Sequence, residues 1–251
     1  MMSRSFYRRM SDALEVSLPG DIEQIREELY IKRDDLLHPV ISGNKWRKLS
    51  GYLYLNEQEG NTGILTFGGA YSNHLHATAK VCEILDIPFK SIVKGFPSYA
   101  DNSTLSQIRD WGAELIFLTP TEYEEEKDEI QSWKLRFPNY TIVPEGGKGP
   151  VGHWGFEWFF DEMASDIGNP ALFVLPAGTG TTARALVKGI PKDWQMEAWP
   201  VISHEDVQEE FKNCTREMLR RIEWKNSLSK TFAAYDAEEV RWVLDWYEET
   251  D

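Results

Sequence analysis

The chain of 251 residues is 41% hydrophobic and has two cysteines, so it is long and apolar enough to bury a core without disulfides or metal ions. Its 41 acidic residues exceed its 27 basic residues, and the resulting net charge of −14 argues against binding to nucleic acid or to anionic membranes. No apolar run approaches the length of a membrane span, and no apolar signal-peptide segment follows the basic N-terminus, so we expect a soluble, cytoplasmic protein.

The first 60 residues predict a strand, a loop and a helix. Leu29–Arg33 is a candidate strand, and the Pro- and Gly-containing segment Asp34–Gly43 is a candidate loop. In Lys45–Glu59 the apolar residues recur near one face, a spacing that predicts a helix.

From Gly63 onward, short apolar runs alternate with amphipathic stretches. The runs predict strands at Gly63–Phe67, Phe89–Val93, Glu114–Leu118, Tyr140–Val143, Ala171–Leu175 and Gln195–Ile202. The stretches predict helices at Ser72–Leu85, Asn102–Trp111, Thr121–Phe137, Val151–Ser165, Thr182–Lys188 and His204–Ile222, and after a loop to Ala234 a last helix at Ala237–Glu248. Alternation at this spacing indicates βαβ units with a mostly parallel sheet, and therefore the α/β fold class.

Neither the cysteines nor the acidic run predicts a metal site. Cys82 and Cys214 lie in helix-like stretches without a CxxC or His neighbour, so buried thiols are expected. The carboxylates of Glu122–Glu129 are consecutive, which is typical of a solvated helix face and not of one coordination sphere.

One lysine has surroundings that suit a nucleophile. In the segment Ser42–Lys48, Lys45 is followed by Arg47 and Lys48, and Gly43 allows a sharp entry into the helix. Burial and nearby positive charge both lower a lysine pKa, which frees the amine to attack near neutral pH. Taken alone, the segment also fits an ordinary basic helix start on the surface.

The segment Thr66–His74 joins a predicted strand to a predicted helix through two glycines. Ser72 or Asn73 would cap the helix, whose free N–H groups then face the edge where open α/β sheets bind ligands. A carboxylate would be stabilised there. The alternative is an ordinary cap in a tight turn, with His74 in a structural role.

The segment Pro176–Thr182 follows the strand Ala171–Leu175 and opens a helix. Its glycines let backbone amides approach an anion closely, and its threonines add hydroxyl donors, so it is a generic phosphate cradle. It lacks the Lys-Ser/Thr ending of a nucleotide P-loop and the third glycine of a dinucleotide fingerprint.

The order of these segments resembles the family of 1-aminocyclopropane-1-carboxylate (ACC) deaminase and D-cysteine desulfhydrase, which are pyridoxal 5′-phosphate (PLP) enzymes. A Gly-Asn-Lys-x-Arg-Lys-Leu block from Gly43 precedes a Gly-Gly-x-x-Ser-Asn-His block from Gly68 and then the Gly/Thr loop. Ile31–Leu36 and the Pro-Glu-Gly-Gly run from Pro144 also match. The resemblance is specific from Ile31 to Thr182 and looser to Tyr235.

The resemblance implies a role for each matching residue. Lys45 looks like the catalytic lysine that holds PLP as a Schiff base, and Lys48 and Asn73 resemble cofactor-binding residues, for the phosphate and the phenolic oxygen. The substrate-binding residues of the family resemble Ser72, Asn73, His74 and Tyr235. Of these, Ser72 and Tyr235 are also candidate catalytic residues, in addition to Lys45. The loop residues Gly178, Thr179, Gly180, Thr181 and Thr182 match the phosphate site.

The resemblance also implies an architecture. Fold type II PLP enzymes, similar to tryptophan synthase β, have two open parallel-sheet domains with the active site in the cleft between them. We expect residues 1–48 and 144–251 to form a large PLP-binding domain and residues 49–143 a small domain. The family further implies a homodimer and a small amino-acid substrate.

The resemblance leaves the reaction open. His74 favours the D-cysteine desulfhydrase type, which yields a 2-oxo acid, ammonia and sulfide, over ACC deaminase. The family's later Asp-Pro-Val-Tyr-x-Gly-Lys stretch, which separates the two reactions, is not found after Ala237–Glu248. A second hypothesis is therefore a truncated homologue that binds PLP with weak or no activity. A third is a phosphate- or nucleotide-binding module that uses only the loop at 178–182.

Overall fold

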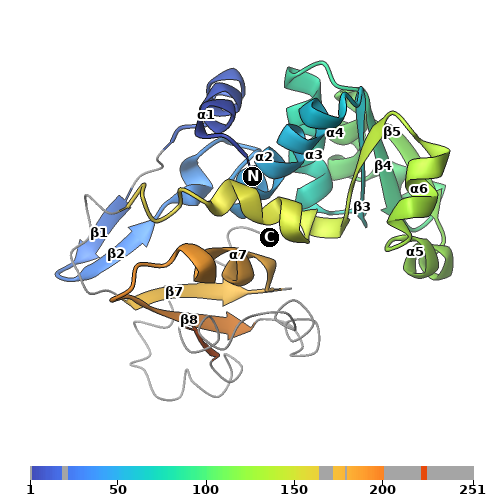
Figure 1. Ribbon diagram of the computed structural model, residues 1–251. Helices are drawn as coiled ribbons and strands as arrows, with labels where there is room; N and C mark the ends of the chain where they lie inside the picture. The colour runs from blue at the N-terminus through green and yellow to red at the C-terminus, as the bar shows by residue number, and fades with distance from the viewer. Residues whose placement is uncertain (1, 19–21, 164–171, 179, 201–221, 225–251) are drawn as a thin grey trace. The chain divides into compact units, whose positions relative to one another are not determined.

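The computed structural model describes residues 2–18, 22–163, 172–178, 180–200 and 222–224 (Figure 1). The chain divides into two units, Met1–Asp166 and Ile167–Asp251, and each is treated separately below. The domain boundaries expected from the family resemblance stay a prediction. Within the described part of the chain, no helix is both long and apolar enough to cross a membrane.

The first unit is built on a four-stranded parallel sheet with the order β5-β4-β3-β6. Its strands are β3 (Gly63–Gly69), β4 (Phe89–Lys94), β5 (Glu114–Leu118) and β6 (Tyr140–Val143). The sequence predicts all four, because strands buried on both faces read as short continuous apolar runs. Their parallel pairing confirms the α/β class.

Helices cover both faces of this sheet. The first unit contains α1 (Arg4–Ala13), α2 (Gly43–Glu59), α3 (Asn73–Ile84), α4 (Ser103–Asp110), α5 (Pro120–Glu126) and α6 (Ile130–Arg136). Ile64 and Val143 belong to a core that includes residues of α2, α3 and α4, whereas Leu65 and Ile142 belong to one that includes aromatic residues of α5 and α6. Successive strand residues therefore point to opposite helical layers.

Three elements near the N-terminus are not predicted from the sequence: a helix, a strand and a short 3₁₀ helix. The prediction misses α1, in which four of the ten residues are charged but which buries Phe6 and Tyr7. It also misses β1 (Ile22–Arg26), which pairs antiparallel with β2 (Leu29–Lys32). Glu28 in the intervening turn has φ +62°, a conformation for which Gly or Asn is the usual signal. A short 3₁₀ helix, η1 (Asp34–Leu36), lies in the predicted loop.

Two predicted helices differ from the structure. The expected helix Thr121–Phe137 is two helices, α5 and α6, and Thr119 closes a capping box at the start of α5. The expected helix Val151–Ser165 begins as a 3₁₀ helix, η4 (Pro150–Phe156), packed closely on α2. A Cβ on Gly155 would overlap the carbonyl of Arg47, so glycine is required where these two segments touch. Two further 3₁₀ segments are η2 (Pro97–Asp101) and η3 (Glu145–Gly147).

The second unit contains a parallel sheet of order β7-β8-β9. Its elements are β7 (Leu172–Ala177), α7 (Thr181–Gly189), β8 (Gln195–Pro200) and β9 (Ile222–Trp224). The prediction of a loop directly after Ile222 is wrong, because β9 occupies three residues, too few to show a period in the sequence. The predicted helix His204–Ile222 is wrong at Ile222, which begins β9, and its other residues lie outside the described part of the chain. Cys214 and the predicted helix Ala237–Glu248 lie outside it as well.

Candidate active site

Lys45 lies in the first turn of α2. Ser42 precedes the helix in an extended conformation, and Gly43 has φ +57°, which gives the sharp entry that the sequence predicts. The Nζ atom of Lys45 donates a hydrogen bond to Oδ1 of Asn44 at 3.2 Å. Burial lowers the pKa of Lys45 below its usual value, as a nucleophilic amine requires.

The expected contribution of Arg47 to this pKa shift is wrong. Arg47 is fully buried, and its guanidinium forms two hydrogen bonds with Asp34, at 2.6 and 3.0 Å. It also bonds Glu162 at 2.8 and 3.2 Å. These carboxylates compensate the charge of Arg47, and the pKa of Lys45 falls because of burial alone.

The same acids extend into a buried ionic network. The Nζ atom of Lys32 lies 3.1 Å from Asp34 and 3.7 Å from Glu162. Burial by itself would raise the pKa of Asp34, but Arg47 and Lys32 outweigh it and hold the pKa below its ordinary value. The network ties the start of α2 to β2, to η1 and to the segment after η4, and so fixes the helical turn that carries Lys45.

The turn between β3 and α3 is tight and capped. A Cβ on Gly68 would approach Oγ of Ser72 to 2.7 Å and Cγ of Leu75 to 2.8 Å, so glycine makes the turn possible. Oγ of Ser72 accepts from the backbone N–H of Leu75 at 3.3 Å, which confirms the predicted cap. Asn73, the first residue of α3, is exposed, and a Cβ on Gly69 would meet nothing within 4 Å.

His74 points inward, unlike its neighbour Asn73. Its side chain is buried, and its Nε2 atom lies 2.9 Å from Oγ1 of Thr66 on β3. Burial first, and then the positive charges of Lys45 and Lys48, lower the pKa of His74 to about 3. The ring is therefore neutral at physiological pH.

The glycine-rich run after β6, at Gly146 and Gly147, packs against the side chains of Lys48 and His74. Nζ of Lys48 donates to the carbonyl of Gly146 at 3.3 Å. Gly147 has φ +68°, and a Cβ there would lie 3.1 Å from Cβ of Lys48 and 3.5 Å from Cε1 of His74. The structure thus brings together Lys45, Lys48, His74 and the Pro-Glu-Gly-Gly run, although they come from distant parts of the sequence.

The second unit carries the predicted phosphate loop between β7 and α7. Gly180 precedes the helix with φ +84°, Thr181 begins it and is buried, and Thr182 follows. The first N–H groups of a helix have no intrahelical acceptor, and a Cβ on Gly178 would meet nothing within 4 Å. Thr179 and Tyr235 lie outside the described residues.

Sequence reasoning missed the partners of these side chains. It assigned no role to Thr66, Asp34 or Glu162, each of which contacts a motif residue. Thr66 belongs to the quoted strand–turn segment, but nothing in that segment indicates that its hydroxyl meets His74. Glu162 is 115 residues from Arg47, and no local pattern reports such a contact.

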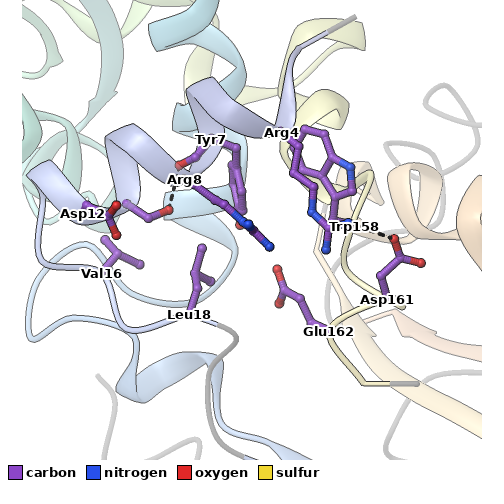
Figure 2. A pocket seen from close by; sticks show the side chains of 10 residues that line it. Arg4, Tyr7, Arg8, Asp12, Val16, Leu18, Trp158, Asp161 and Glu162 are labelled. Carbon is purple, nitrogen blue, oxygen red and sulfur yellow. Dashed lines mark hydrogen bonds and ion pairs between the residues drawn. The ribbon is translucent and has the colours of Figure 1, made fainter. Parts of the chain in front are cut away.

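A cavity of about 540 Å³ lies elsewhere in the first unit, between α1 and the segment Trp158–Glu162 (Figure 2). Arg4 and Arg8 line it together with Asp12, Asp161 and Glu162, and Arg8 and Glu162 extend into it from opposite sides. None of the predicted site residues lines it. Its charges are of both signs, so it does not provide the positive pocket that an anionic ligand needs.

Comparison with known proteins supports the resemblance. A Thermotoga maritima protein named "Putative 1-aminocyclopropane-1-carboxylate deaminase" is 34% identical over 170 residues, 64% of this chain and 54% of that one. A D-cysteine desulfhydrase of Klebsiella pneumoniae is 26% identical, over 55% of this chain and 44% of its own. The chain spans about half the length of the curated relatives it matches.

Solved structures show the same fold. The crystal structure of an ACC deaminase homologue superposes with a TM-score of 0.60 at 21% identity, covering 88% of this chain and 68% of the other. Serine racemase from Dictyostelium discoideum gives a TM-score of 0.61 at 16% identity, covering 83% of this chain and 68% of the other. The fold is that of fold type II PLP enzymes. The family described as "Pyridoxal-phosphate dependent enzyme" matches residues 15–249, and the chain belongs to this family.

Proposed function

We propose that the protein is a PLP-dependent lyase or deaminase acting on a small amino acid, with PLP attached to Lys45. One observation carries the proposal: a half-buried lysine with a lowered pKa acts, together with Lys48, on the ring of His74, and the glycine-rich run at Gly146 and Gly147 lies against Lys48 and His74. The names of the relatives, ACC deaminase and D-cysteine desulfhydrase, supply the substrate class.

The described residues fit the chemical groups of PLP. The aldehyde needs an amine that loses its proton readily, which Lys45 offers because partial burial lowers its pKa. The phosphate needs N–H donors and open space, which the start of α7 and Gly178 offer. Asn73 presents an exposed amide for the phenolic oxygen. We assign the phosphate to the loop at 178–182.

When bound, PLP supplies an electron sink for carbanion chemistry, and the protein supplies orientation and electrostatics. Once the amino group of the substrate had taken the place of Lys45 on PLP, the released amine of Lys45 would be available to take a proton, which for D-cysteine is the α-proton. Ser72 uses one lone pair for the helix cap, which leaves its O–H to donate to the substrate carboxylate. His74 also belongs to the proposed substrate site. The presence of histidine at position 74 favours D-cysteine over ACC.

Cofactor attachment is tested by absorption and labelling. The purified chain is mixed with PLP, its near-visible spectrum is recorded, and borohydride then fixes the cofactor on its lysine for peptide mass analysis. We expect a borohydride-sensitive band and a label on Lys45 that are lost in Lys45→Ala. Lys80→Ala, on the exposed side of α3 with a partner in Glu83, should keep both. A wild-type chain without the band contradicts the proposal.

The phosphate assignment is tested with pyridoxal, which lacks the phosphate. Gly178→Val fills the open space at the end of β7 and should weaken binding of PLP several-fold, with little effect on pyridoxal. Equal losses for the two ligands would place the phosphate elsewhere.

Turnover is a separate question from binding. Release of ammonia and sulfide from D-cysteine, or of ammonia and 2-oxobutanoate from ACC, identifies the reaction. A chain that binds PLP at Lys45 but releases neither set of products would support the alternative, a PLP-binding homologue with weak or no activity.

A further inference from the structure

The hydrogen bonds around Thr66 determine which nitrogen of His74 carries the proton. Oγ1 of Thr66 lies 2.8 Å from the carbonyl oxygen of Val143, which can only accept, so the single hydroxyl hydrogen is donated there. The contact between Oγ1 and Nε2 of His74, at 2.9 Å, must then use a hydrogen on the ring. His74 is therefore held as the Nε2–H form.

The other ring nitrogen is left as a buried acceptor. In a neutral ring protonated on Nε2, the Nδ1 atom has a lone pair and no hydrogen. This atom has no hydrogen-bond partner within the described residues, and because only 3% of the residue is exposed, bulk water does not reach it either. Buried polar atoms without a partner are uncommon in native proteins, and each one points to a group that completes it.

The surroundings of His74 indicate what that group is. The charged groups that act on the ring are Lys45 and Lys48, both cations on α2. Cε1 of the ring also lies near Gly147, whose backbone brings no charge. The Nδ1 lone pair accepts a hydrogen and repels a carboxylate, so of the two charged groups of a small amino acid it selects the ammonium group and not the carboxylate.

We propose that Nδ1 of His74 accepts a hydrogen bond from a primary amino group beside Lys45, and that Thr66 is a positioning residue that holds the ring in its Nε2–H form. The amino group is either the neutral amine of Lys45 itself or the ammonium group of the small amino acid that binds there. The second source rests on the proposed function. The proton position of His74 does not, because it follows from contacts within the chain.

The proton position is tested by nitrogen NMR of the full chain labelled with ¹⁵N-histidine, near neutral pH and without PLP. The signal of His74 is identified by its loss in His74→Gln. We expect one Nε2–H form in the wild type, a loss of that preference in Thr66→Val, and its recovery in Thr66→Ser. A ring protonated on Nδ1 or on both nitrogens, or a Thr66→Val variant identical to the wild type, overturns the proposal.

Thr78 provides a matched control for the threonine substitution. It is as fully buried as Thr66, but its hydroxyl donates to the backbone carbonyl of His74 at 2.7 Å and not to the ring. Thr78→Val should therefore leave the proton position of His74 unchanged. If it changes the ring as much as Thr66→Val does, the positioning role of Thr66 is refuted.

Two compounds test which amino group donates to Nδ1 of His74. ACC carries an amino group, and its analogue cyclopropanecarboxylate does not. If the amino acid is the donor, ACC shifts the Nδ1 signal and cyclopropanecarboxylate does not. If Lys45 is the donor, Lys45→Ala shifts the signal before any ligand is added. No shift in either arm rejects the acceptor role. If PLP fails to bind while these shifts appear, the proposed function falls and this inference stands.

Discussion

At the scale of single residues, Lys45 and His74 are both pushed toward their neutral forms by burial. The motif around Lys45 shows a neighbouring arginine, but it does not show that Arg47 turns toward acids that neutralise it. A charge next to a lysine in the sequence acts on its pKa only if no partner compensates it.

The shifted pKa of His74 predicts an acid-sensitive stability. Its pKa is about 3 in the folded chain and about 6.5 when unfolded, so between these values the unfolded chain binds the extra proton. The contribution of His74 to the free energy of unfolding should be fully present above about pH 6.5. Below that pH it should fall on acidification by up to about 1.4 kcal/mol per pH unit. Urea unfolding of PLP-free protein between pH 6.5 and 4 measures the slope.

His74→Gln removes the titrating ring and should flatten this slope, while other groups that titrate in the same range contribute equally to both proteins. Parallel stability curves for wild type and His74→Gln would show that His74 keeps an ordinary pKa.

At the scale of elements, the ionic network predicts an unequal response to loss of a charge. Glu162→Gln leaves Arg47 buried with one carboxylate fewer, and should destabilise the chain by about 3–5 kcal/mol. Glu57→Gln removes an exposed pair with Arg9 and should cost no more than about 1 kcal/mol. Urea unfolding at neutral pH compares them, and equal losses would mean that the buried network adds little.

The contact between α2 and η4 predicts intolerance to a single methyl group. Gly155→Ala places a Cβ against the carbonyl of Arg47 and the hydroxyl of Ser50, and overpacking of this kind costs about 1–3 kcal/mol or more. Gly69→Ala meets open space and should be nearly neutral. Thermal unfolding measures both variants, and the midpoint should fall in Gly155→Ala but not in Gly69→Ala. A stable Gly155→Ala variant would require the helices to separate at little cost.

The sequence predicts a strand well where the strand is buried on both faces, because its residues then form one continuous apolar run. Strands β3 to β6 lie in a sheet covered on both faces, and their apolar runs are continuous. It fails where a distant contact decides the conformation. The segment after Pro150 has an amphipathic helical pattern, but it must approach α2 through glycines, and it begins as a 3₁₀ helix.

At the scale of the whole molecule, attachment of PLP predicts a gain in stability. A ligand that binds only the folded chain adds free energy by mass action, about 2.7 kcal/mol at 100 times its dissociation constant. The midpoint of thermal unfolding should therefore rise with PLP concentration in the wild type and not in Lys45→Ala. A rise of the same size in Lys45→Ala would place the stabilising PLP at another site.

The sequence also predicts much of the candidate site, because its motifs keep their order and spacing. Lys45, Lys48 and His74 lie near one another, while the roles that the family resemblance gives them stay predictions. Their supporting residues could not be predicted, because they depend on which strands pair. Thr66 reaches the carbonyl of Val143 only through the register that joins β3 to β6.

That register has a consequence for biosynthesis. Thr66 and Val143 are 77 residues apart, and β6 is the last strand of its sheet to leave the ribosome. At about 5–20 residues per second, roughly 4–15 seconds separate the synthesis of the hydroxyl from that of its acceptor. Until β6 docks, the hydroxyl of Thr66 lacks this acceptor and can donate to Nε2 of a ring that is protonated on Nδ1. The preference of His74 for the Nε2–H form therefore arises only when the sheet is completed.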